Sequence, residues 1–194
     1  MDSQLLKKKL VAILKSNKDD LYKKIAVISV ITAALKEFKV TPVIVGGQAV
    51  EFYTSGGYST LDIDILCELR IFEIDSVLKS LGFEREGMYW TYPDSKLAIE
   101  VPSGPLAGSW DKVTEVAIEG LEAYIIGIED IIVDRLNRYK YWKEFDDEEW
   151  IIGMIFINYD DIDWDYLYMK AGEERTTDEL KRFKDIVDDK LRDE

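Results

Sequence analysis

The spacing of hydrophobic positions changes along the chain, and each change predicts a different kind of element. Residues 5–15 and 21–38 carry apolar side chains at helical spacing, which predicts two helices. Between residues 40 and 126, short apolar or alternating runs are separated by glycine and proline, which is typical of strands and turns. The predicted strands are 40–45, 60–69, 88–92, 96–101, 113–118 and 121–126, and the predicted helices among them are 48–53 and 72–81.

After Gly127 the spacing of apolar residues is helical throughout. It predicts helices over 128–145, 147–157, 162–171 and 178–191. The chain therefore belongs to the α+β (mixed α/β) class, and the class of element changes near Gly127. We expect an α/β core over residues 1–126 and a helical part over residues 127–194 that packs on the core.

The residue types restrict the chemistry that is available to the chain. Its 194 residues include no histidine and one cysteine, Cys67. These counts exclude a histidine general base, a Ser-His-Asp triad, a histidine-containing zinc site and an internal disulfide. Catalysis would have to use carboxylates, lysines, tyrosines or hydroxyls, and carboxylates without histidine or cysteine favour Mg²⁺ or Mn²⁺.

The charge and the hydropathy of the chain restrict its partners. Lys and Arg number 25 against 39 Asp and Glu, so the net charge is −14, whereas duplex-binding proteins normally present a basic face. The longest apolar run, residues 25–35, is shorter than the roughly 20 residues that span a bilayer, and the first residues do not resemble a signal peptide. With a lone cysteine, we expect a cytoplasmic protein with no membrane partner. Abundant Glu, Lys and Ile beside few Gln indicate a thermophilic source.

A glycine pair follows the first predicted strand. Gly46 and Gly47 come directly after that strand, and Gln48 opens a short helix. Glycine lets the backbone approach a phosphate closely, and a helix N-terminus supplies free N–H groups. The pair predicts a phosphate cradle, with a simple tight turn as the alternative.

Three carboxylates follow a pattern that suits metal ligands. Asp62 and Asp64 are two residues apart in a predicted strand, so both point to one face, and Glu100 occupies a similar position in strand 96–101. Neighbouring anions repel unless a cation lies between them, and three acids can hold two Mg²⁺ ions about 3.5–4 Å apart for nucleotidyl transfer. The alternative is a solvated strand face with scattered charges, and Glu115 and Glu119 are alternatives for the third acid.

Together these residues resemble the nucleotidyltransferase superfamily. Residues 46–50 (GGQAV), residues 60–64 (TLDID) and the later Glu100 are similar to the glycine pair, Asp-x-Asp and third carboxylate of that superfamily. The resemblance is closest to small prokaryotic members, which include minimal nucleotidyltransferases and the toxin components of abortive-infection-type toxin–antitoxin pairs. Relatives often carry an arginine where this chain has Tyr58 and Ser59.

The resemblance implies a nucleotidyltransferase-like mixed β-sheet flanked by helices, with the C-terminal helical part closing over the site. The residues implied for catalysis and metal binding are Asp62, Asp64 and Glu100, and those considered for nucleotide binding are Gly46, Gly47, Gln48, Ser59 and Thr60. The alternative role of Gln48 is to begin a helix, and that of Ser59 and Thr60 is to shape a turn.

The implied activity is metal-dependent transfer of NMP from an NTP to a hydroxyl acceptor, with release of pyrophosphate. The acceptor would be a small molecule, a protein side chain or an RNA end, and a toxin role would add an antitoxin partner. The alternatives are an inactive nucleotide-binding or regulatory module with the same fold, and an acidic adaptor.

Cationic and aromatic residues after Gly127 each have more than one interpretation. Arg135, Arg138 and Lys140 would reach a triphosphate or cover an exposed helix face. The aromatic residues Trp142, Trp150, Phe156, Trp164 and Tyr168 would stack on a base, pack in a core or form a partner interface such as a homodimer.

Overall fold

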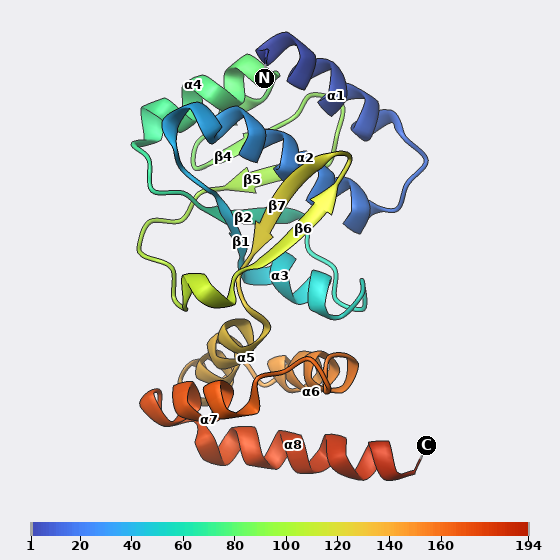
Figure 1. Cartoon of the computed structure of the whole chain (residues 1–194), viewed down its shortest axis with the longest axis vertical. Helices are drawn as coiled ribbons and strands as arrows, with labels where there is room; N and C mark the ends of the chain where they lie inside the picture. The colour runs from blue at the N-terminus through green and yellow to red at the C-terminus, as the bar shows by residue number, and fades with distance from the viewer. Residues whose placement is uncertain (1, 194) are drawn as a thin grey trace.

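Seven strands form one mixed sheet in the order β3–β4–β5–β2–β1–β7–β6 (Figure 1). The computed structural model describes residues 2–193. The pairs β1–β7 and β2–β5 are parallel, and the other neighbouring pairs are antiparallel. The strands are β1 (Val43–Val45), β2 (Asp62–Leu66), β3 (Glu84–Glu86), β4 (Tyr89–Thr91), β5 (Ala98–Glu100), β6 (Thr114–Ile118) and β7 (Leu121–Ile125).

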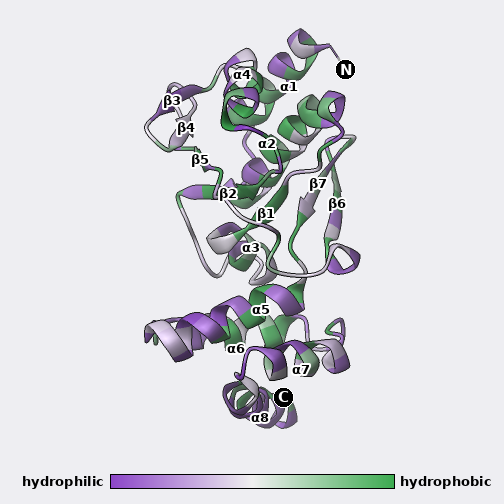
Figure 2. Cartoon of the chain, turned by 90° about the vertical axis from the view of Figure 1, so that its left-hand side faces the viewer, coloured by the Kyte–Doolittle hydropathy of each residue, from purple (hydrophilic) through white to green (hydrophobic). Residues whose placement is uncertain are grey.

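Three helices pack together on one side of the sheet. These are α1 (Ser3–Lys15), α2 (Asp20–Leu35) and α4 (Ile71–Leu81), and they lie on the side away from the C-terminal helices (Figure 2). Side chains of Asp2 and Asp19 accept hydrogen bonds from the first backbone N–H groups of α1 and α2. Residues 24–33 of α2 are all buried, which explains why this helix is apolar all round rather than on one stripe.

The opposite side of the sheet carries α3 (Gly46–Tyr53) and the C-terminal helices. The latter are α5 (Ile128–Asn137), α6 (Asp147–Ile157), α7 (Trp164–Glu173) and α8 (Thr177–Arg192), and they form a layer of their own below the sheet (Figure 1). Helix α3 contacts both β2 and the helices α5 and α6, so it joins the sheet to that layer.

Side chains alternate between the two faces of the central strands. Ile63, Ile65, Trp90 and Ile99 are fully buried, and the indole N–H of Trp90 donates to Asp75 of α4 at 3.0 Å. The alternate positions in β2 and β5 therefore point away from α4, toward α3 and α5.

The structure confirms the expected class, a mixed β-sheet flanked by helices, and it differs from several of the expected elements. Strand β3 (Glu84–Glu86) was not predicted because its three residues are all charged. The helix expected over 128–145 ends at Asn137 and continues as a π-helical turn, Arg138–Trp142. A short 3₁₀ turn, Lys36–Phe38, replaces the expected end of a helix, and a second one, Trp110–Lys112, was not predicted and precedes β6. Within residues 2–193, no helix has the length and apolarity that crossing a membrane requires.

Candidate active site

Strand register brings three carboxylates together. Strand β2 pairs in parallel with β5, so that Asp62 lies opposite Ala98 and Asp64 lies opposite Glu100. Paired residues point to the same face, and carboxylate oxygens of Asp62, Asp64 and Glu100 lie within 4.8 Å of one another. Glu115 lies on β6, at the far edge of the sheet, and the Glu119 carboxylate accepts a hydrogen bond from Tyr22. The third acid of this carboxylate triad is therefore Glu100.

The electrostatics of the triad favour a bound cation. Burial, together with the charges of Asp62 and Glu100, raises the pKa of Asp64 to about 6, against the opposing effects of Arg135 and a backbone hydrogen bond from Gly47. A set of oxygen ligands without histidine or cysteine suits Mg²⁺ or Mn²⁺. The three residues therefore fit a hard divalent cation, which would relieve the repulsion among them.

The glycine pair packs directly against the triad. Gly46 has φ = +61°, and a Cβ atom at this position would overlap the carboxylate of Asp64. Position 46 thus requires glycine for two reasons: the backbone is left-handed there, and the Asp64 carboxylate approaches it closely. Helix α3 begins at Gly46, and its N-terminal turn faces the triad from the end of β1.

Thr60 connects the triad to a buried ion pair. Its hydroxyl donates to Asp62 Oδ1 at 2.6 Å. Its carbonyl oxygen accepts from Lys24 Nζ at 2.6 Å, and its backbone N–H donates to Glu51 Oε2 at 3.3 Å. Lys24 and Glu51 are buried and 2.7 Å apart. This ion pair is not among the residues predicted from the sequence, although a lysine at the start of a long apolar helical run was a signal for it.

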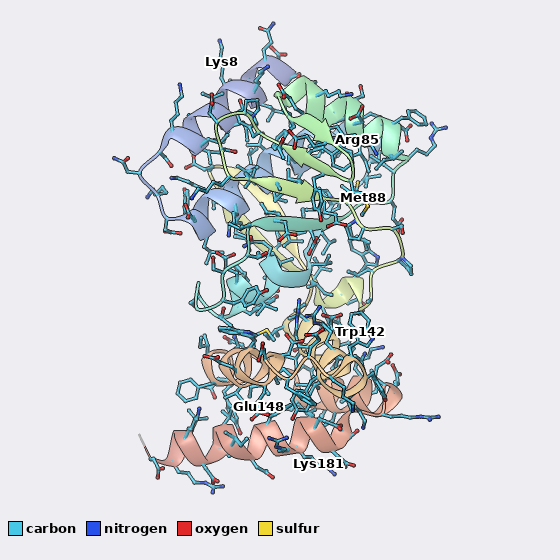
Figure 3. The ribbon with its side chains drawn as sticks, turned by 180° about the vertical axis from the view of Figure 1, so that it is seen from behind. Lys8, Arg85, Met88, Trp142, Glu148 and Lys181 are labelled. Atoms are coloured by element: carbon cyan, nitrogen blue, oxygen red, sulfur yellow. The ribbon has the colours of Figure 1, made fainter. Side chains whose placement is uncertain are left out.

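A cavity of about 680 Å³ opens over the triad, between the sheet and the helical layer. Its walls come from the glycine pair, from the segment after β5 and from α5 with the turn that follows it. The lining residues include Tyr58, Pro102, Pro105, Ala107, Asp134, Arg135, Arg138 and Trp142. Figure 3 shows Trp142 where the helical layer meets the rest of the molecule.

Two arginines on the cavity wall share one buried carboxylate. Arg138 Nε donates to Asp147 Oδ2 at 2.8 Å, and an Arg135 guanidinium nitrogen lies 3.6 Å from Asp147 Oδ1. The guanidinium of Arg138 also lies over the Trp142 ring, 5.8 Å from its centre. Asp147 at the start of α6 thereby fixes both cations on the wall of the cavity.

The other residues singled out from the sequence lie away from this cavity. The Gln48 side chain is fully buried, neither of its amide atoms has a hydrogen-bond partner among the described residues, and it does not line the cavity. Ser59 is exposed and lines neighbouring grooves instead. Lys140 pairs with Glu179 at 3.0 Å. Trp150 packs edge to face on Tyr58, with ring centres 5.1 Å apart, and so supports the cavity wall from behind.

The fold resembles those of several solved structures, of which two are described here. One is an antigenic nucleotidyltransferase-like protein from Paracoccidioides brasiliensis, with 22% identity, a TM-score of 0.53, and coverage of 71% of this chain and 76% of that one. The other is ANT(2")-Ia in complex with adenylyl-2"-tobramycin, with 17% identity, a TM-score of 0.52, and coverage of 79% of this chain and 97% of that one. At these identities the likeness concerns the fold. A search of curated proteins finds no significant match.

The sequence itself identifies the family. Residues 20–191 match the family described as "Nucleotidyltransferase of unknown function (DUF6036)". The match includes the glycine pair, the Asp-x-Asp strand, Glu100 and all four C-terminal helices up to Leu191. The chain belongs to this nucleotidyltransferase family.

Proposed function

We propose that the protein is a metal-dependent nucleotidyltransferase that moves NMP from an NTP to a hydroxyl acceptor. The observation that carries the proposal is the triad of Asp62, Asp64 and Glu100, whose oxygens lie within 4.8 Å of one another at the base of a cavity with two arginines on its wall. Acids for a divalent cation and cations for a triphosphate are thus assembled around one space of suitable size.

Each group has a part in the proposed reaction. The acceptor oxygen forms a bond to the α-phosphorus, the bond from that phosphorus to the bridging oxygen breaks, and pyrophosphate leaves with that oxygen. The proton of the acceptor hydroxyl passes to a carboxylate of the triad or to solvent. Mg²⁺ or Mn²⁺ held by the triad would stabilise the charge that develops on the phosphate oxygens. Arg135 and Arg138 neutralise the triphosphate, and Gly46 and Gly47 let the α3 N-terminus approach it closely.

In the proposed reaction, the α/β core and the C-terminal helical part supply different groups to the site. Residues 1–126 supply the triad and the glycine pair, and residues 127–194 supply the arginines and close the cavity. The adenylylated tobramycin in the ANT(2")-Ia complex supports a small-molecule acceptor. The net charge of −14 disfavours an RNA end, and a toxin paired with an antitoxin rests on the sequence resemblance alone.

An inactive nucleotide-binding module is the second candidate. Tyr58 and Ser59 stand where relatives often carry an arginine, which favours this alternative. The arginines of α5 and the turn after it offset that substitution, because they line the same cavity. Three clustered carboxylates also repel one another without a cation, so their presence together favours a working metal site.

The proposal is tested by following the transfer of a labelled α-phosphate from an NTP to an acceptor. The protein is incubated with Mg²⁺, each α-³²P-labelled NTP in turn, and separate metabolite, protein and RNA fractions as acceptors. An active enzyme labels a product in one fraction, and Asp64→Asn reduces the rate by on the order of a hundredfold or more. The matched control Asp160→Asn, at an exposed acid in the turn after α6, keeps the parent rate. Nucleotide binding without any labelled product in the three fractions would favour the inactive module.

A further inference from the structure

The carboxylate triad lies between two hollows, and Thr60 and Asp62 line both of them. The first is the cavity described above, which contains Arg135 and Arg138. The second is an open groove of about 540 Å³ that runs from β2 across β5 and β4 to β3. We call it the β3–β5 groove. Its lining residues are Ser59, Thr60, Leu61, Asp62, Glu86, Tyr89, Thr91 and Ala98.

Strand register makes the floor of this groove a continuation of the triad's own face. Ala98 lies opposite Asp62 on one side and opposite Thr91 on the other. Glu100 lies opposite Tyr89, which in turn lies opposite Glu86. Paired residues share a face, and neighbouring strands are about 4.8 Å apart, so the floor extends roughly 10–15 Å from the triad. A molecule lying on it would reach the triad with one end.

The groove differs from the cavity in charge. Its lining includes no lysine or arginine, and its polar groups are the carboxylates of Asp62 and Glu86 and the hydroxyls of Ser59, Thr60, Tyr89 and Thr91. The Tyr89 phenol is a neutral hydrogen-bond donor at neutral pH, and Tyr89 lies opposite Glu100 in the sheet. Leu61, with an exposed fraction of 74%, supplies an apolar surface beside these groups. The triad thus separates a side that attracts phosphates from a side that repels them.

The surface beyond Leu61 does not attract phosphates either. A neighbouring groove there includes Lys23, Lys24 and Lys96. Lys24 is paired with Glu51, and the two other lysines are matched by Asp20 and Asp94 in the same lining. Its charges therefore balance, and it offers no basic track for a nucleic-acid backbone.

We infer that the β3–β5 groove binds the acceptor, and that the acceptor is a small hydroxyl compound that carries a positive charge. The inference rests on the proposed function and adds the substrate class to it. Glu86 would pair with the cationic group, the hydroxyls of Tyr89 and Thr91 would bind the hydroxyls of the acceptor, and Leu61 would cover its apolar surface. The reacting hydroxyl oxygen would then bond to the α-phosphorus beside Asp62, and pyrophosphate would leave on the side of the arginines.

Three sugars with one scaffold and different charges test this inference. Glucosamine is cationic, glucose is neutral and glucose 6-phosphate is anionic at neutral pH. Each is added as acceptor with Mg²⁺ and the NTP that stabilises the protein most, and formation of a nucleotidylated sugar is followed by mass spectrometry. The rates are measured for the parent chain, for Glu86→Lys, and for Glu115→Lys, which makes the same charge change at an exposed position of β6 on the far edge of the sheet.

We expect glucosamine to react fastest and glucose 6-phosphate slowest. Glu86→Lys should reduce the preference for glucosamine over glucose 6-phosphate by about tenfold, because it replaces an attraction with a repulsion at a partly screened site. Glu115→Lys should leave the preference unchanged. The inference is overturned if glucose 6-phosphate reacts best, if Glu86→Lys leaves the order unaltered, or if Mg²⁺ and NTP stabilise the protein but no sugar reacts. If Mg²⁺ and NTP do not stabilise the parent chain at all, the proposed function itself is wrong.

Discussion

The ammonium of Lys24 and the carboxylate of Glu51 form a buried ion pair, 2.7 Å apart, that holds the segment leading into the triad. Both groups also bind the backbone of Thr60, whose hydroxyl donates to Asp62. Helices α2 and α3 thereby fix the position of Asp62, a carboxylate of the triad that belongs to neither helix. A buried ion pair contributes little net stability compared with a well-packed apolar pair. We therefore expect its main role here to be the positioning of Thr60 and Asp62.

Removal of one member of the pair should be more harmful than removal of both. Lys24→Met leaves Glu51 charged and unpaired in the core, and we expect a loss of about 3–5 kcal/mol in the free energy of unfolding. The double variant Lys24→Met/Glu51→Met should recover most of this loss. Urea denaturation of both variants measures the difference, and a double variant as unstable as the single one would argue against the pair as the cause.

Gly46 is expected to tolerate no side chain. Gly46→Ala combines the strain of a left-handed backbone, about 1–2 kcal/mol, with an overlap on the Asp64 carboxylate. Gly56→Ala is the matched control, since Gly56 also has positive φ but nothing lies within 4 Å of the added Cβ. Thermal denaturation with and without Mg²⁺ and NTP should show ligand stabilisation kept in Gly56→Ala and lost in Gly46→Ala. Equal behaviour of the two variants would contradict the close packing against Asp64.

Asp64 should make the metal-free protein less stable as the pH rises. Its folded-state pKa of about 6 lies above the ordinary 3.8, so the folded state binds the proton more tightly, and stability falls as pH rises through this window. Asp64→Asn removes this loss and should be more stable than the parent by about 1–2 kcal/mol at pH 7, after allowance for solvent screening at a half-buried site. The difference should be near zero at pH 3.5. Denaturation curves across this range in EDTA check both the size and the sign.

Arg138 should contribute to nucleotide binding, whereas Lys140 should not. Arg138 lines the cavity and is held by Asp147, so Arg138→Ala is expected to weaken NTP binding about tenfold by removing a charge-assisted contact. Lys140, two residues later, pairs with Glu179 outside the cavity. Calorimetric titration of NTP in the presence of Mg²⁺ compares the two alanine variants, and equal losses would point to net charge rather than position.

The sequence was sufficient to predict the central strands and the acids that they carry. Asp62 and Asp64 point the same way because the period of a strand is two, and Ile63 and Ile65 between and beside them mark the buried face. The choice of Glu100 over Glu115 required the order of strands, which depends on long-range pairing that local spacing does not encode.

The cavity wall and the neighbouring groove were harder to predict. Arg135 and Arg138 were equally compatible with an exposed helix face, and only the packing of α5 against α3 places them on the wall of the cavity over the triad. Strand β3 lacks apolar residues, so the floor that contains Glu86 had no hydrophobic signal. The burial of Gln48 and the position of Ser59 outside the cavity likewise follow from tertiary packing.

The most direct test of the central claim is the melting temperature with each of the four NTPs, with and without Mg²⁺ or Mn²⁺. Ligand at one hundred times its dissociation constant should stabilise the protein by about 2.7 kcal/mol. We predict a metal-dependent rise for the parent chain and for Asp160→Asn/Asp161→Asn, which removes two exposed acids, and no rise for Asp62→Asn/Asp64→Asn. A rise that persists in Asp62→Asn/Asp64→Asn, or no rise with any nucleotide in the parent chain, would contradict a metal–nucleotide site at the carboxylate triad.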